Sequence, residues 1–159
     1  MPFLLVSGFL FNILISFWTL VIGTVAGAAL GLGQISTFGP LRAFSWFITQ
    51  LFRNSPWLVI LFIVLLALPF EFTTFGQTIR VPDWMKGVFG LSLPVMANIS
   101  EVVRGAVQSV PTAQWEAAES LAFSRRQILW QIILPQCFKR MLPPWMNWYA
   151  ILTLSLIHI

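Results

Sequence analysis

The first 41 residues contain no Asp, Glu, Lys or Arg. An apolar, uncharged stretch of 18 or more residues predicts a membrane-crossing helix, because it fills the hydrocarbon core without burying a charge. Over the whole chain 58% of residues are hydrophobic and only 9% are charged, whereas an average soluble domain has about 25% charged residues. The sequence therefore predicts an integral membrane protein and excludes an ordinary soluble domain.

Prolines and charges divide the chain into four apolar stretches. We expect each to be a helix, because backbone groups of an open strand stay unsatisfied in lipid. The predicted spans of this single all-α transmembrane bundle, residues 1–159, are 9–32, 44–68, 86–109 and 138–159. The connections are a short link at 33–42, a polar loop at 69–84 and a longer link at 110–135.

Basic residues mark the expected orientation of the bundle. Only Arg80 and Lys86 belong to the second link and its flanks, whereas seven basic residues belong to the first and third links: Arg42, Arg53, Arg104, Arg125, Arg126, Lys139 and Arg140. Because basic residues accumulate in cytoplasmic loops, the first and third links should be cytoplasmic and the N-terminus outside.

Two local patterns leave alternatives open. Gly23, Gly27 and Gly31 recur every four residues, so they share one helix face and allow another helix to approach closely. That helix could belong to the same subunit or to a second one. In the second span, Pro56 could either start a new helix or kink a longer helix that begins near Phe44.

The link at 110–135 is predicted to form two short helices outside the bilayer. Pro111 suits a helix start, and Ser124-x-x-Gln127 is a capping box that begins the second helix. An apolar stripe of Ile128, Leu129, Ile132 and Ile133 follows, and we expect Pro135 to end that helix. Two amphipathic helices of this kind form a platform for a partner.

Motifs in and around this link resemble those of a known family. Glu116-Ala117-Ala118, followed by Ile132-x-Leu134-Pro135, is similar to the EAA loop of ABC importer permeases. The branch for polar amino-acid uptake is indicated by Phe52-Arg53-Asn54-Ser55-Pro56, by the stretch from Glu101 to Pro111, and by Leu142-Pro143-Pro144. These motifs extend over most of residues 44–147 in the family's order and spacing, which makes the resemblance specific.

The resemblance implies a bacterial inner-membrane permease subunit for polar amino acids, with four of five core helices present. Its EAA loop would dock on a cytoplasmic ATPase subunit through Glu116, Ala117, Ala118, Ser120, Leu121, Ala122 and Phe123. Further implied partners are a second permease subunit, the same or similar, and an extracytoplasmic solute-binding protein on the 69–83 side. The chain has no GxxxxGK[ST] phosphate loop, so ATP hydrolysis would belong to the separate subunit and the chain itself would not be an enzyme.

Two departures from the family pattern lead to expectations. Ala122 stands where the family usually has glycine, and a left-handed alanine there would cost about 1 kcal/mol. After the double proline the family continues into a polar stretch and a fifth helix, whereas this chain reads 151–159 as a short apolar end. We expect that end to be truncated or frame-altered.

Ionisable side chains inside a span are candidates for function. Glu101 and Arg104, three residues apart, can pair, and Asn98 lies one turn earlier. These residues could face the translocation pathway, or they could orient the coupling loop, which we slightly favour. One Cys and one His exclude the usual metal-site spacings, and no cofactor is expected. The alternatives are an ATP-independent secondary transporter or channel and a non-transporting membrane subunit.

Overall fold

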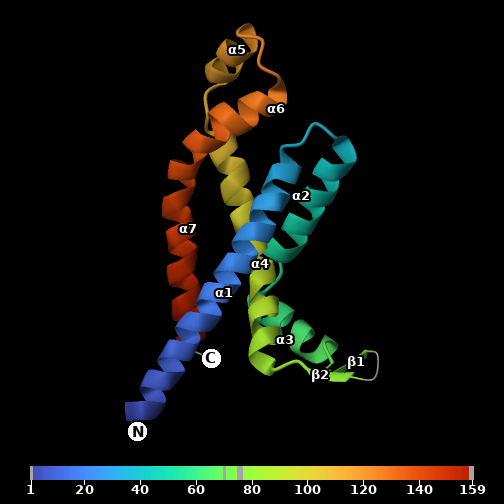
Figure 1. Ribbon diagram of the computed structural model, residues 1–159, viewed down its shortest axis with the longest axis vertical. Helices are drawn as coiled ribbons and strands as arrows, with labels where there is room; N and C mark the ends of the chain where they lie inside the picture. The colour runs from blue at the N-terminus through green and yellow to red at the C-terminus, as the bar shows by residue number, and fades with distance from the viewer. Residues whose placement is uncertain (1, 70, 75–76, 158–159) are drawn as a thin grey trace.

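The computed structural model describes the backbone of residues 2–69, 71–74 and 77–157. The chain forms an elongated helical bundle with α4 (Asp83–Gln108) at its centre and α1 (Pro2–Gln34) packed along it (Figure 1). α4 contacts α1 most extensively, and it also packs on α2 (Gly39–Arg53), α3 (Trp57–Ala67) and α7 (Leu134–Ile157). The expected all-α bundle is confirmed, with the predicted first span inside α1.

The core of the bundle follows the buried face of α4. Val95, Ile99 and Val103 are at most 5% exposed and pack with Leu20 of α1 and Leu152 of α7. Pro94 also lies inside α4, where it removes one backbone hydrogen bond. The outward faces are lined with exposed large apolar side chains such as Phe17, Phe47 and Phe62, as expected of a surface that contacts lipid.

The second apolar stretch is broken into two helices. α2 ends at Arg53, α3 begins at Trp57, and the two axes are bent by 100°. Pro56 has no N–H to continue the ladder, and Ser55 Oγ donates to the Leu51 carbonyl oxygen at 2.7 Å. The structure thus decides the question that the sequence left open: a new helix starts after Pro56, and residues 44–68 do not form one continuous helix.

Length and composition identify fewer spans than the four predicted. Within the described residues, Ser7–Gln34 alone is long and apolar enough to cross a membrane, and the bent α2–α3 pair passes when taken together. α4 contains Lys86, Glu101 and Arg104, and α7 contains Lys139 and Arg140, which lowers the hydropathy of both helices. The division into four membrane spans therefore remains a prediction.

The link at 110–135 differs from expectation in its second half. α5 (Thr112–Ser120) is followed by a turn and then by α6 (Arg125–Gln127). From α6 the chain continues through the π-helical turn η1 (Ile128–Ile133) into α7 as one unbroken helix. Pro135 therefore does not end the second helix, contrary to the sequence prediction. The proline ring crowds the carbonyl group four residues earlier, and that position lies in η1, where the Leu134 N–H donates to the Leu129 carbonyl oxygen five residues back.

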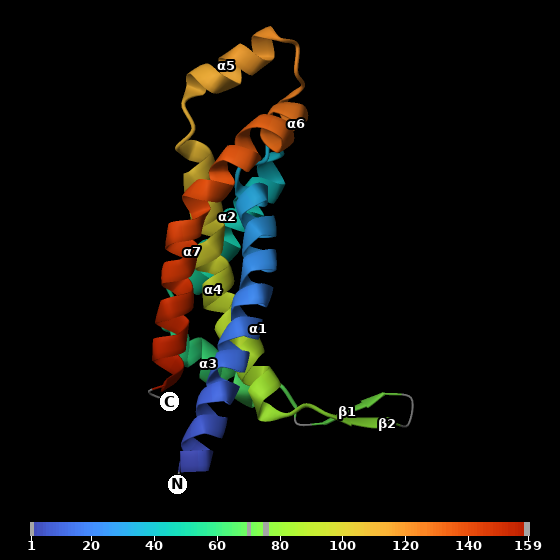
Figure 2. The ribbon, with the colours of Figure 1, turned by 60° about the vertical axis from the view of Figure 1, so that its left-hand side comes forward.

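The polar loop at 69–84 also contains structure that the sequence analysis did not predict. Strands β1 (Glu71–Thr74) and β2 (Gln77–Arg80) pair antiparallel, with Glu71 opposite Arg80. This hairpin projects from the end of the bundle opposite to α5 and α6 (Figures 1 and 2). The molecule thus has two distinct ends.

Candidate functional site

α5 lies across one end of the bundle (Figure 2). Its two faces differ in exposure. Glu116, Ala117 and Ser120 are exposed, and Leu121, which follows the helix, is 73% exposed. Ala118 in contrast is only 4% exposed. The motif Glu116-Ala117-Ala118 therefore presents its first two side chains outward and uses the third for packing.

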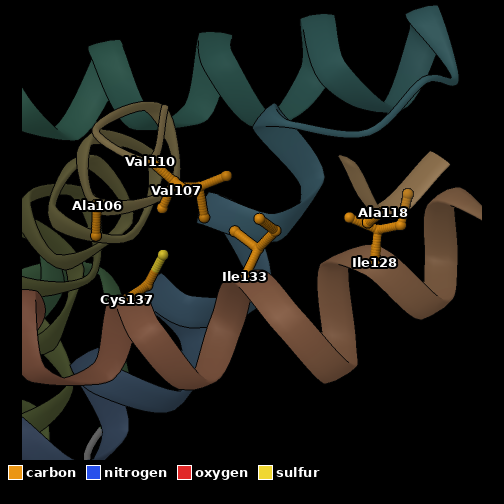
Figure 3. Close-up of a cluster of buried hydrophobic side chains, with 7 residues drawn as sticks. All are labelled: Ala106, Val107, Val110, Ala118, Ile128, Ile133 and Cys137. Atoms are coloured by element: carbon orange, nitrogen blue, oxygen red, sulfur yellow. The ribbon is translucent and has the colours of Figure 1, made fainter. Parts of the chain in front are cut away.

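The inward face of α5 contacts an apolar cluster that joins three parts of the chain (Figure 3). Ala118 lies against Ile128 of η1, and Ile133 and Cys137 point toward the end of α4. The members of this coupling cluster are Ala106, Val107, Val110, Ala118, Ile128, Ile133 and Cys137. Trp115 and Phe123 pack on it from α5 and the following turn. Through these contacts α5 packs against the end of α4, against η1 and against the start of α7.

The turn after α5 is closed by a Schellman pair of hydrogen bonds. The Ala122 N–H donates to the Glu119 carbonyl oxygen at 2.9 Å, and the Phe123 N–H donates to the Ala118 carbonyl oxygen at 3.3 Å. Ala122 has φ 60°, the left-handed conformation in which glycine is usual. The turn typical of glycine is therefore formed by alanine, at a cost of about 1 kcal/mol.

The next helix begins with the capping box that the sequence predicts. Ser124 Oγ accepts from the Gln127 N–H at 3.4 Å, and the Ser124 N–H donates to Gln127 Oε1 at 2.9 Å. The corner between α5 and α6 is thus held from both sides by local hydrogen bonds. Its exposed residues have a defined backbone geometry.

Arg140 makes a further connection at the base of this loop. Its Nη1 donates to both the carbonyl oxygen and the Oγ of Ser109, each at 2.7 Å. Ser109 is the C-cap residue of α4, so a cation neutralises the negative end of that helix. The sequence analysis used Arg140 only as a marker of orientation and missed this contact between residues 31 positions apart.

Glu101 is the centre of a polar cluster further along α4. Glu101 Oε2 accepts from Arg104 Nη2 at 2.6 Å and lies 3.6 Å from Arg53 Nη1 at the end of α2. Asn98 Nδ2 donates to the Pro94 carbonyl oxygen at 2.8 Å, within its own helix. A cavity of about 480 Å³ is lined by Glu101, Asn98 and Arg53 and extends to Trp148. The expected pairing of Glu101 with Arg104 is present, and Arg53 is an additional partner.

A buried polar triad lies near this cluster. Gln34 Nε2 donates to Thr49 Oγ1 at 2.9 Å and to Ser100 Oγ at 3.2 Å, and the two hydroxyl groups are 2.9 Å apart. The triad links α1, α2 and α4, and all three residues are at most 6% exposed. The sequence analysis did not select these residues, because single uncharged polar residues give no spacing pattern.

The glycines of α1 face α4 of the same chain. A Cβ atom at Gly23, Gly27 or Gly31 would lie 2.6 to 2.7 Å from atoms of α4. Real Cβ atoms essentially never have contacts under 3.0 Å. In this structure the glycine face is therefore covered by a helix of its own subunit.

Comparisons with known proteins agree on one family. The family model for "Binding-protein-dependent transport system inner membrane component" matches residues 19–147. The protein named "Probable amino-acid ABC transporter permease protein y4tF" of Sinorhizobium fredii is 37% identical over 130 residues, 82% of this chain and 55% of that protein. The glutamate transport system permease protein GluD of Corynebacterium glutamicum is 37% identical over 79% of this chain and 45% of its own length.

A solved structure is also similar to this chain over nearly its whole length. The one described as "Crystal structure of an amino acid ABC transporter with histidines" is similar with a TM-score of 0.81 and 25% identity, over 96% of this chain and 68% of that chain. The chain thus spans about half the length of these two curated relatives, and the family model matches residues 19–147 of it. It belongs to the family of binding-protein-dependent transport system inner membrane components.

Proposed function

We propose that this chain is the permease part of an ATP-driven importer for polar amino acids and that α5 couples it to a separate ATPase subunit. The observation that carries this proposal is the two-sided geometry of α5. Glu116, Ala117 and Leu121 are exposed and free for a partner, while Ala118 is buried in the coupling cluster. The similarity to proteins named as amino-acid ABC transporter permeases supports the substrate class.

The contacts below α5 suit the transmission of a force. A partner that moves α5 also moves the coupling cluster, because close-packed side chains have little compressibility. The end of α4 follows through this cluster and through the bond from Arg140 to Ser109. The Schellman turn and the capping box keep α5 from shifting separately from η1. ATP-driven movement at the loop would thus reach α4 and α7 together.

We further propose the cytoplasm as the location of α5 and the outside as the location of the N-terminus. The excess of Arg and Lys at the α5 end of the chain supports this orientation. The hairpin end would then face the solute-binding protein, and a second permease subunit, the same or similar, would complete the pathway. Cysteine labelling tests the orientation, since Cys137 is fully buried: a Ser120→Cys variant should react with an impermeant maleimide only after the membrane is opened.

We place Glu101 as a positioning residue for the loop. Its carboxylate joins the end of α2, through Arg53, to the last two turns of α4, through Arg104. Both arginines would repel one another across this junction without the carboxylate between them. The competing proposal is that Glu101 contacts the transported solute directly. Only in that case should a substitution of Glu101 change the affinity for the substrate.

The decisive experiment reverses the charge of Glu116. In the complete transporter, Glu116→Lys should abolish most ATP-driven uptake and reduce co-purification of the ATPase subunit, because its exposed carboxylate would become a cation at the docking face. Membrane insertion should be unchanged, since Glu116 contributes nothing to the buried core. Glu116→Gln, which removes the charge without adding a cation, is the graded control and should keep more uptake and assembly than Glu116→Lys. Normal uptake and assembly in Glu116→Lys would contradict the coupling role.

A further inference from the structure

An apolar cavity of about 440 Å³ opens between α1, α4 and α7. Ala28, Ile99, Val103, Phe138 and Met141 are among its lining residues. The hydroxyl group in the lining, that of Thr24, already accepts a hydrogen bond from Trp145 Nε1 at 2.8 Å. Because water in a cavity needs two to four polar partners, this cavity suits a hydrocarbon group.

A second cavity of about 640 Å³ lies nearer to the α5 end of the bundle. Leu32 lines both cavities. Leu129 of the second cavity and Leu134 of the first are joined by the backbone hydrogen bond of one π-helical turn. The two cavities are therefore neighbours, and we call the space that they line between α1 and the run from α6 to α7 the seam.

The outer part of the seam is basic. Arg125 and Arg126 line the second cavity and are exposed. Within the part of the chain that the structure describes, no ion pair or side-chain hydrogen bond engages either guanidinium group. Trp130, which is 54% exposed, lines the same cavity. Tryptophan is typical of the headgroup level of a membrane, and basic pockets between helices suit anionic lipid headgroups.

We propose that this seam binds an anionic phospholipid, with one acyl chain in the apolar cavity and the phosphate at Arg125 and Arg126. Charge complementarity selects the occupant, because the two exposed guanidinium groups can form charge-assisted hydrogen bonds with phosphate oxygens. The adjoining cavity has room for an acyl chain, and the Thr24 hydroxyl group in its lining is already bonded to Trp145. The proposal requires only that the chain lies in a membrane, and it is independent of the proposed transport function.

The test measures lipid retention on the purified full chain. The chain is placed in lipid discs with phosphatidylglycerol and phosphatidylcholine of identical acyl chains, and native mass spectrometry records which lipid stays bound. Phosphatidylglycerol should be retained preferentially, and Arg125→Gln with Arg126→Gln should weaken its binding about 30-fold, or about 5-fold for each arginine. Higher salt should reduce the preference, and excess inorganic phosphate should not release the lipid, because it lacks the acyl chain.

Two further variants separate the parts of the site. Arg42→Gln with Lys139→Gln removes the same charge at the same end, from residues that line neither cavity, and should leave retention unchanged. Ala28→Leu fills the apolar cavity while both arginines remain, and should lower retention of both lipids.

Unchanged binding of phosphatidylglycerol in the Arg125 and Arg126 variant would overturn the proposal, as would an equal loss in the control. If Ala28→Leu does not fold, the arginine variant and its control still decide the question. A protein segment in the cavity is the competing occupant and predicts no retained lipid.

Discussion

Gly27 on α1 provides the sharpest test of how the bundle is held together. A Cβ atom at this position would lie 2.6 Å from the Met96 carbonyl oxygen and 2.8 Å from Ile99 Cβ. Ordinary van der Waals contact begins at 3.4 Å. Both neighbouring atoms belong to the α4 backbone or to the rigid base of a branched side chain, so neither can rotate away. In Gly27→Ala the two helices must separate locally by 0.6 to 0.8 Å, the difference between those contacts and 3.4 Å.

The expected cost follows from this separation. A gap of about 0.5 to 1 Å loses about a quarter to a half of each contact energy of about 0.1 to 0.2 kcal/mol, and a buried side chain makes about 40 to 60 such contacts. With the middle of the ranges for the lost fraction and for the contact energy, the packing loss is about 2 to 4 kcal/mol. Alanine is the better helix former by about 1 kcal/mol. We therefore expect Gly27→Ala to lower the free energy of unfolding by about 1 to 3 kcal/mol.

Equilibrium unfolding in mixed detergent and SDS, followed by far-UV circular dichroism, measures this effect. Gly87→Ala is the matched control, because a Cβ at Gly87, inside α4, meets nothing within 4 Å. The control should be stabilised by about 0.5 to 1 kcal/mol, since only helix propensity changes. If Gly27→Ala is as stable as the wild type while Gly87→Ala behaves as expected, the close approach of α1 and α4 does not depend on the missing side chain.

Two other substitutions test the loop and the polar cluster. Ala122→Gly should relieve the left-handed alanine and stabilise the turn after α5 by about 1 kcal/mol, seen as slower hydrogen exchange at the Ala122 and Phe123 amides; unchanged or faster exchange would contradict the strain. Glu101→Gln removes the carboxylate shared by Arg53 and Arg104 and should lower stability by about 1 kcal/mol, because both arginines are partly exposed. In uptake assays of the complete transporter it should lower the maximal rate with unchanged KM, and a raised KM would favour direct contact with the solute.

Features that depend on neighbouring residues were predictable from the sequence. The uncharged first 41 residues predict a long apolar helix, and α1 extends over most of them. The pattern Ser124-x-x-Gln127 predicts a capping box, which the structure contains. Glycine at the family's turn position and Ala122 in this chain differ by one methyl group, so the strain of that turn was also predictable. The capping box and the turn are each decided within about one helical turn, and the long helix by an unbroken apolar stretch, so the local sequence holds the groups that matter.

The break at Pro56 and the continuity through Pro135 required the structure. Both prolines remove a backbone hydrogen bond, yet the first separates α2 from α3 by a bend of 100° and the second is absorbed by η1. The difference depends on what surrounds each helix: Ile128, Ile133 and Cys137 are buried in the coupling cluster on both sides of Pro135, which favours a continuous helix there.

The sequence by itself determined that this protein is a helical membrane bundle, that its first helix is long and apolar, and which loop presents the EAA motif. The tertiary structure alone decided which faces meet: Gln34 bonds Ser100 across 66 positions, and Trp145 bonds Thr24 across 121. The physical reason is the range of the interactions. Apolar pattern and capping act between near neighbours, whereas the triad, the glycine contact and the seam between α1 and α7 exist only after distant helices have packed.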